Sequence, residues 1–278
     1  MAEFGKYNVN PLVDKYEKML RSGEVYFFDI EDFEIISDYY ISHGDDVMAI
    51  DVLCMAISQH SYSADLLVRR AQLYIDVLKM EKAKRDLDAA LELDPEHADG
   101  LIALAEWYSK RGQHNKAIQN LRQAAEILGS YEEINLLLAQ EYLEMANYRK
   151  AAEYFKAVLL EDYDDGSALF SLSFCYDMLG ETQELIKFLK QYIDDNPYSE
   201  IAWHQLGLLY QKNRQYDLAI EAYDYACLVD EYFSAAYYEK ARTYEEMGDF
   251  EKAITTYEEI MEIEDSNTYA YLRIGLAY

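Results

Sequence analysis

The chain has 278 residues, of which 51% are hydrophobic, so it holds enough apolar material for a large core and is not a disordered protein. Eleven glycines and three prolines leave few helix breakers, which favours helix throughout. The formal net charge of −28 repels phosphate and anionic lipid headgroups, and this argues against nucleic-acid and membrane-surface roles.

The first 29 residues predict one helix and a linker. Asn10 and Pro11 form a helix-start signal, and Ser22-Gly23 forms a stop signal. The apolar stripe between them consists of Leu12, Tyr16 and Leu20. We expect this helix to cap the structure that follows. Asp29, with Asp32 three residues later, predicts the N-cap of the next helix.

An internal period organises the rest of the chain. Tyrosine recurs every 34 residues without exception, at Tyr40, Tyr74, Tyr108, Tyr142, Tyr176, Tyr210, Tyr244 and Tyr278. The period divides the chain into seven complete repeats and a partial one, namely 30–63, 64–97, 98–131, 132–165, 166–199, 200–233, 234–267 and 268–278. Such a period is the signature of a solenoid.

Each repeat predicts two helices that approach closely. In the first half of each repeat, a small residue stands three positions before the periodic tyrosine. In the second half of every complete repeat except the fifth, a second small residue is followed four positions later by a large apolar or aromatic residue. At 100° per residue these positions share one helix face, which a helix pair buries only when its neighbours stack on it.

The sixth repeat carries the pattern most fully, as Trp203, Leu206, Gly207, Tyr210, Ala219, Tyr223 and Ala226. These residues resemble the motif of the tetratricopeptide repeat family position by position, and the resemblance covers residues 30–278. It implies an all-α fold, a right-handed superhelical solenoid of antiparallel helix pairs, and a non-enzymatic scaffold that binds proteins. The stretches 26–29 and 38–40 also resemble the start of long uncharacterised cytoplasmic bacterial members.

Two departures from the pattern carry expectations. Glycine occupies the turn between the two helices only in alternate repeats, and Leu78, Ala146 and Arg214 stand there in the others. Because a left-handed turn residue is easiest as glycine, we expect those three turns to have a different geometry or some strain. In the fifth repeat Leu185 replaces a small residue, so the stack should bend or splay there.

The last repeat is partial. It predicts one helix whose core face carries Tyr271, Ile274 and Tyr278 and whose outer face carries Leu272 and Leu276. Because a solenoid needs a polar terminal cap, we expect the natural chain to continue beyond residue 278. The alternative is that this helix is itself the cap. The incomplete repeat also offers a route to self-association.

Signatures of catalysis are missing from the sequence. It has no Gly-x-Gly for a nucleotide loop, and no His-Glu-x-x-His or Cys-x-x-Cys for a metal, so no cofactor and no metal are expected. Cys54, Cys175 and Cys227 fit no disulfide framework and are interpreted as small buried apolar groups. The start carries no secretory signal pattern and no long apolar run exists, which favours a cytoplasmic protein.

The face of each first helix opposite the packing face lines the concave groove in this family. It is mostly acidic in the first three repeats, at Glu31, Glu34, Asp38, Asp65, Gln72, Asp76, Asp99, Glu106 and Lys110. In repeats four to six it becomes largely apolar, and the predicted partner-binding residues are Leu136, Gln140, Leu143, Phe170, Phe174, Met178, Ile201, His204, Leu208 and Gln211. Charge returns at Arg242, Glu245 and Glu246.

Contiguous exposed apolar surface usually marks an interaction site. The competing interpretation is that neighbouring helices bury these residues. His204 is expected to be an ordinary polar surface residue rather than a titrating switch.

The sequence therefore predicts a scaffold that holds a basic or amphipathic protein or peptide segment, and neither nucleic acid nor membrane. Some family members grip a chaperone carboxylate, but the matching positions here are Glu34, Asp38, Val68, Gln72, Ile102 and Glu106. Their charge has the wrong sign, so no such clamp is expected. The alternative function is a regulatory or substrate-recruiting arm of an enzyme whose catalytic part lies beyond residue 278.

Overall fold

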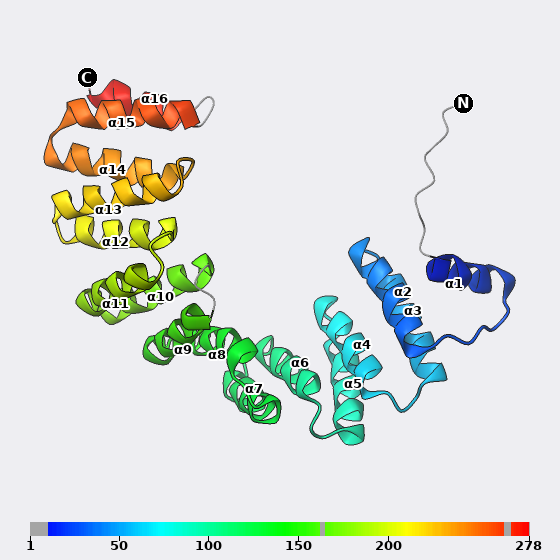
Figure 1. Cartoon of the computed structure of the whole chain (residues 1–278). Helices are drawn as coiled ribbons and strands as arrows, with labels where there is room; N and C mark the ends of the chain where they lie inside the picture. The colour runs from blue at the N-terminus through cyan, green and yellow to red at the C-terminus, as the bar shows by residue number, and fades with distance from the viewer. Residues whose placement is uncertain (1–10, 162–164, 264–267, 278) are drawn as a thin grey trace, which may run out of the picture. The chain divides into compact units, whose positions relative to one another are not determined.

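The computed structural model describes residues 11–161, 165–263 and 268–277, which form sixteen α-helices and no β-strand (Figure 1). The chain divides into two compact bodies, called here the N-terminal body, Met1–Ile134, and the C-terminal body, Asn135–Tyr278. The all-helical repeat architecture predicted from the sequence is confirmed.

The helices of the N-terminal body are α1 (Pro11–Ser22), α2 (Ile30–Ser42), α3 (Asp46–Gln59), α4 (Ala64–Asp76), α5 (Met80–Leu93), α6 (Ala98–Ser109) and α7 (His114–Leu128). Next along the chain comes α8 (Glu132–Glu144), most of which belongs to the C-terminal body. The remaining helices are α9 (Tyr148–Glu161), α10 (Gly166–Leu179), α11 (Thr182–Asp195), α12 (Glu200–Lys212), α13 (Tyr216–Val229), α14 (Ser234–Met247), α15 (Phe250–Ile263) and α16 (Thr268–Ala277).

The first helices of successive pairs, from α2 to α16, begin 34 residues apart. Short polar side chains fix several of these starts by accepting a bond from the backbone of the first turn. Ser63 caps α4 through Leu66 N at 3.3 Å, and Asp165 caps α10 through Ala168 N at 2.9 Å. The predicted N-cap of α2 is Asp29, whose backbone N–H donates to Oδ2 of Asp32.

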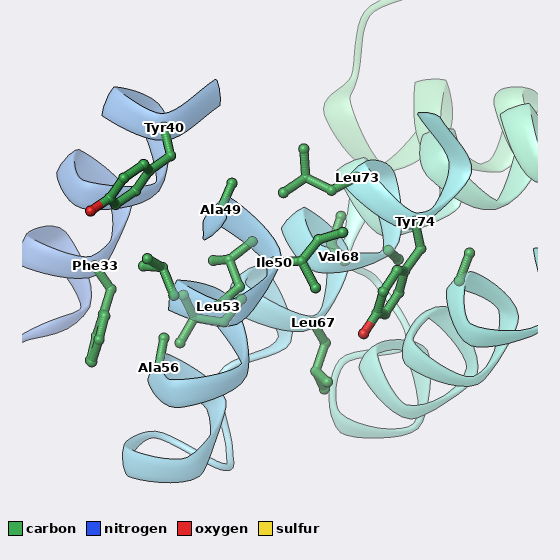
Figure 2. Packing of buried hydrophobic residues seen from close by; sticks show 14 of the residues in the cluster. Phe33, Tyr40, Ala49, Ile50, Leu53, Ala56, Leu67, Val68, Leu73 and Tyr74 are labelled. Atoms are coloured by element: carbon green, nitrogen blue, oxygen red, sulfur yellow. The ribbon is translucent and has the colours of Figure 1, made fainter. Parts of the chain in front are cut away.

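The core runs between the helices of each pair, where the small and large periodic positions meet. Figure 2 shows this in the N-terminal body: Ala49 and Leu53 of α3 are completely buried, with Phe33 and Tyr40 of α2 packed in the same cluster. The small residues let the helix axes approach, and the large ones fill the space between repeats.

One polar pair interrupts this apolar pattern in α4. Arg70 occupies a position that holds leucine in several other repeats, and its Nε and Nη2 each lie 2.7 Å from a carboxylate oxygen of Asp86 in α5. Both side chains are largely buried, and Arg70 also donates to Sγ of Cys54 at 3.3 Å. A buried cation is tolerated here because its donors are matched by a bidentate carboxylate.

All seven turns inside the helix pairs have one geometry. Gly44, Gly112, Gly180 and Gly248 have positive φ, and so do Leu78, Ala146 and Arg214, at 58°, 54° and 59°. In every turn the carbonyl of the periodic tyrosine accepts from the residue five positions later, as in Tyr74 O with Lys79 N at 2.7 Å. The expected change of geometry is therefore wrong, whereas strain at the three non-glycine residues is present.

The fifth repeat differs in its packing, as expected. Helices α10 and α11 approach each other much less closely than the pairs α2–α3, α4–α5, α6–α7, α12–α13 and α14–α15. Leu185 is buried at the site where the other second helices carry mostly alanine, and its bulk holds α11 away from α10.

Two expectations at the ends need correction. The buried stripe of α1 is Val13, Tyr16 and Met19, whereas Leu20 is exposed and Leu12 is half-buried, because the buried residues around Tyr16 are spaced three apart and not four. In α16 the residues that pack on α15 are Ala270 and Ile274, and Tyr271 is exposed. Tyr278 and Asn10 lie outside the described residues.

Candidate functional site

Helix α10 carries a row of exposed apolar side chains. Phe170, Phe174 and Met178 are 47%, 50% and 51% exposed, and their spacing of four residues places them on one helix face. The opposite face is anchored, because Leu172, Cys175 and Tyr176 are buried. The Phe174 ring also meets Tyr148 at the start of α9 edge-on, with ring centroids 5.9 Å apart. The row is thus held in place but uncovered.

Helix α12 is tied to α10 at both of its ends. Ile201 is half-buried because its side chain lies against the backbone of Gly166, where a Cβ would stand 2.4 Å from Cδ1. Lys212, at the other end of α12, forms an ion pair with Asp177 beside Met178. Leu208 is half-buried on the stretch of α12 between these ties. The structure therefore brings the predicted residues of α10 and α12 onto neighbouring helices.

In α8, the Gln140 side chain is exposed, and the Leu136 and Leu143 side chains are half-buried. This helix is fixed to α9 by other residues. Tyr142 stacks on Tyr154 with centroids 5.6 Å apart, and Asn135 donates to Glu161 at 2.8 Å.

His204 does not lie on the surface, contrary to the sequence expectation. It is 7% exposed, and its ring lies 5.4 Å from that of Phe233 and 5.9 Å from that of Tyr223, centroid to centroid. Neither ring nitrogen has a hydrogen-bond partner among the described residues. Burial lowers the pKa of His204 to about 4, so the ring is neutral near pH 7. It cannot offer a polar contact to a partner in this arrangement.

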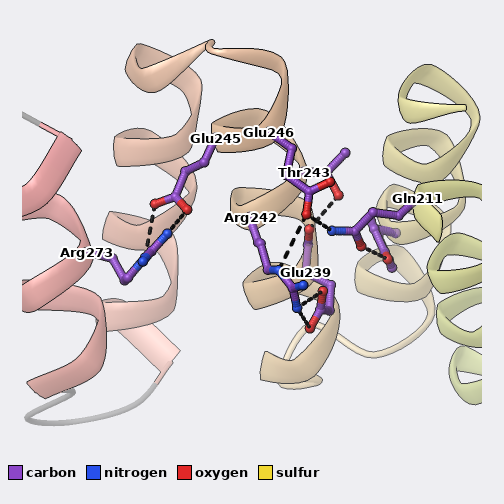
Figure 3. A network of polar contacts seen from close by, with 8 residues as sticks. Gln211, Glu239, Arg242, Thr243, Glu245, Glu246 and Arg273 are labelled. Atoms are coloured by element: carbon purple, nitrogen blue, oxygen red, sulfur yellow. Dashed lines mark hydrogen bonds and ion pairs between the residues drawn. The ribbon is translucent and has the colours of Figure 1, made fainter. Parts of the chain in front are cut away.

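Gln211 is likewise buried and occupied within the fold. Its Oε1 accepts from the Tyr223 hydroxyl at 2.8 Å, and its Nε2 donates to Glu246 at 3.2 Å. Figure 3 shows this amide at one end of a polar network that continues through Arg242 and Glu239. The Gln211 amide is therefore used in packing α12 against α13 and α14, and it is not part of the exposed apolar surface.

The charge that returns in α14 is paired. Arg242 lies 3.4 Å from Glu239 and 3.6 Å from Glu246, and Glu245 binds the guanidinium of Arg273 in α16 through both oxygens (Figure 3). A cavity of about 350 Å³ between α12 and α14 is lined by Leu208, Gln211, Lys212, Arg214, Tyr216, Glu239, Arg242 and Glu246. The pairs of Arg242 lie within α14 at helical spacing, whereas helical periodicity cannot signal the pair of Glu245 with Arg273, because its partners come from different repeats.

In the N-terminal body, part of the predicted acidic face is also engaged. Asp38 pairs with Arg69, and Asp65 accepts from Nε2 of His97 at 2.9 Å. Val68 is buried, which removes it from that face. Glu31 and Glu34 of α2 and Asp99 of α6 keep the face negative.

The residues that the structure describes contain no group of three or more potential metal ligands and no helix long and apolar enough to cross a membrane. The three cysteines are free thiols. Burial raises the pKa of both Cys175 and Cys227 to about 11, so these thiols stay protonated near pH 7.

Models of the tetratricopeptide repeat match residues 64–97, 109–173, 201–232 and 234–267, which together make up more than half of the chain. The chain belongs to the tetratricopeptide repeat family. Proteins built from stacked repeats present extended surfaces to their ligands.

The chain is also similar to two curated proteins and one solved structure. TPR repeat-containing protein YpiA of Bacillus subtilis is 26% identical over 250 residues, which are 87% of this chain and 57% of that protein. Anaphase-promoting complex subunit 3 of Schizosaccharomyces pombe is 22% identical over 185 residues, 66% of this chain and 28% of that protein. The chain thus spans only about half or less of the length of these relatives.

The solved structure is the C-terminal part of a TPR repeat-containing protein from Cytophaga hutchinsonii. It superposes with a TM-score of 0.66 at 17% identity, and the match covers 87% of this chain and 99% of that one. At this identity the likeness shows a shared tetratricopeptide fold.

Proposed function

We propose that the chain is a scaffold that binds a segment of another protein on the apolar surface of α10 and α12. The observation that carries this proposal is the half-exposed row Phe170, Phe174 and Met178, which is rigidly mounted on a helix with a buried opposite face. Large exposed aromatic groups in a row are uncommon on a surface that needs no partner. One of the relatives is by its name a subunit of a multiprotein complex, which supports the same role.

The chemistry of the surface indicates an amphipathic partner helix. Aromatic and methionine side chains at four-residue spacing offer a flexible apolar strip, to which a helix binds through residues spaced three and four apart. Acidic groups remain along the first helices of the N-terminal body, so a segment that binds to that body should be basic. We propose no interaction for His204 and Gln211, whose side chains are buried within the fold.

Capture from native lysate with three forms of the protein tests the proposal. The wild type should retain a partner that Phe174→Ala loses, with a decrease in affinity of roughly thirtyfold, or about 2 kcal/mol, if Phe174 is a central contact. Leu160→Ala is the matched control, because Leu160 is 63% exposed and apolar but lies on α9.

The fold can be checked in the same samples. Because the Phe174 ring is half-exposed, its truncation should lower the melting temperature by only a few degrees. A captured protein that binds Phe174→Ala and Leu160→Ala as tightly as the wild type would show that this surface is not the binding site.

A further inference from the structure

A second cavity in the C-terminal body, of about 400 Å³, lies between α11, α12 and α13. Its lining consists of Lys190, Ile193, Asp194, Trp203, Leu206, Tyr210, Leu218, Glu221, Ala222 and Tyr225. None of these residues belongs to the apolar surface of α10 and α12. The cavity, called here the Trp203 pocket, is therefore a separate feature from the proposed scaffold surface.

The aromatic wall of the Trp203 pocket is fixed in place. Trp203 stacks on Tyr225 with ring centroids 4.5 Å apart and an interplanar angle of 22°. The indole Nε1 donates to the carbonyl oxygen of Pro197 at 3.0 Å, which sets the rotation of the ring. A flat aromatic surface held in this way is a ready site for stacking.

Two carboxylates in the pocket have no partner of their own. Asp194 on α11 and Glu221 on α13 are exposed to solvent, and neither makes an ion pair or a side-chain hydrogen bond with any residue in the described ranges. The one cation of the lining, Lys190, has its ammonium 5.7 Å from the centre of the Tyr210 ring. The charged groups of the lining therefore sum to a net negative charge.

The other repeats show what such a location accepts. The position of Leu206 is occupied by Arg70 in α4 and by Lys240 in α14. Arg70 is paired with Asp86, and Lys240 lies 2.7 Å from Asp224 at the edge of the corresponding cavity between α13 and α15, next to Glu259. In those two repeats the chain supplies both the cation and its carboxylate. The Trp203 pocket has Leu206 in place of the cation, and its carboxylates are Asp194 and Glu221, because Ala222 and Lys190 stand at the positions of Asp86 and Asp224.

We propose that the Trp203 pocket binds an arginine side chain of a protein partner. The arginine stem would lie on Leu206 and Leu218 and its guanidinium on the stacked pair of Trp203 and Tyr225, with its N–H groups donating to Asp194 and Glu221. Arginine suits this wall better than lysine because its guanidinium is flat, stacks on aromatic rings and donates in two directions. The net charge of −28 favours the approach of a basic partner.

A nuclear magnetic resonance titration tests this assignment, because the chain has only two tryptophans. The probe is the peptide acetyl-Ser-Gly-Arg-Gly-Ser-amide, added to the full chain labelled with ¹⁵N. The indole signal of Trp203 should shift in a saturable manner, and that of Trp107 should not. The same peptide with citrulline, which is neutral and nearly the same shape, should bind at least about fivefold more weakly.

Variants locate the interaction. Asp194→Asn and Glu221→Gln should each weaken binding by about fivefold, and Lys190→Gln, which removes a repelling charge, should strengthen it by about threefold. Asp195→Asn is the charge-matched control, because Asp195 is exposed on the same helix and does not line the pocket. Phe174→Ala should bind the peptide as the wild type does, which separates this proposal from the scaffold proposal.

Several results would overturn the assignment. These are an unshifted Trp203 signal, equal shifts at Trp107, equal binding of the citrulline peptide, or unchanged binding in Glu221→Gln. Equal affinity for the same peptide with lysine in place of arginine would show that the pocket does not select a guanidinium.

Discussion

Gly207 of α12 lies directly against the ring of Tyr223 in α13, so that a Cβ at Gly207 would stand 2.4 Å from Cε1 of that ring. Gly207→Ala should therefore lower the free energy of unfolding by about 2 kcal/mol, because Tyr223 is fully buried and has no room to shift. Urea denaturation measures the change. Gly275→Ala is the control: among the described residues, no atom outside its own stretch of helix lies within 4 Å of its Cβ position, so alanine there should be neutral or slightly stabilising. Equal effects at the two glycines would show that the contact with Tyr223 is unimportant.

Because all seven turns are left-handed, replacing a turn residue other than glycine by glycine should increase the stability of the protein. Leu78→Gly and Ala146→Gly should each raise the free energy of unfolding by up to about 1 kcal/mol, because their positive φ is costly for any residue with a Cβ. Gly112→Ala, at the same place in another repeat, should have the opposite sign. Thermal unfolding of the three variants would test this, and a loss of stability in Leu78→Gly would mean that the turn carries no strain.

The Arg70–Asp86 pair should behave as a unit. Arg70→Leu restores the residue found in several other repeats but leaves Asp86 buried without its cation, and the variant should lose about 3 kcal/mol. In the double variant Arg70→Leu/Asp86→Ala most of that loss should disappear. A double-mutant cycle by denaturant unfolding gives the coupling, and additive effects would contradict a mutual interaction.

His204 predicts a specific dependence of stability on pH. The pKa of His204 falls from 6.5 to about 4 on folding. Between these two values the ring is mostly protonated in the unfolded state and mostly neutral in the folded state. The stability contributed by the neutral ring should decrease as the pH falls from about 6.5 towards 4, by about 2 kcal/mol over the first one and a half units.

His204→Phe isolates this effect from the titration of the many carboxylates. The variant should be more stable than the wild type near pH 7, by about 1 kcal/mol, since two unpartnered buried nitrogens are removed. The difference between the two proteins should grow as the pH is lowered to 5. A constant difference across that range would show that the ring is solvated.

The repeating features of the fold could be predicted from the sequence because they depend on local spacing. The tyrosine period located the helix pairs, and the bulk of Leu185 predicted the looser packing of α10 and α11. At Leu78, Ala146 and Arg214 the expected change of turn geometry was wrong and only the expected strain is present, because the bonds to the tyrosine carbonyls impose the backbone shape whatever the residue.

The candidate site was harder to predict, because burial depends on neighbouring helices. On a wheel of α12 alone, His204 and Gln211 face away from the core. In the structure His204 is covered by Tyr223 and Phe233, and Gln211 by Tyr223 and α14. The exposure of Phe170 and Phe174 agrees with the pattern of α10, while their role as contacts to a partner stays a prediction.

Helix α10 packs sparsely on α11 and is joined to α12 mainly by the contact of Ile201 with Gly166 and by the ion pair of Lys212 with Asp177, so we expect the helices on the two sides of this junction to open as two cooperative blocks. Phe174 lies on the block that ends with α10, and Leu208 on the block that follows. Amide hydrogen exchange should accordingly show that the two blocks open separately in the free protein, since contiguous regions exchange as units. A ligand held by both residues would join the blocks. When such a ligand binds, hydrogen exchange should detect one opening event in place of two, even at amides far from the contact.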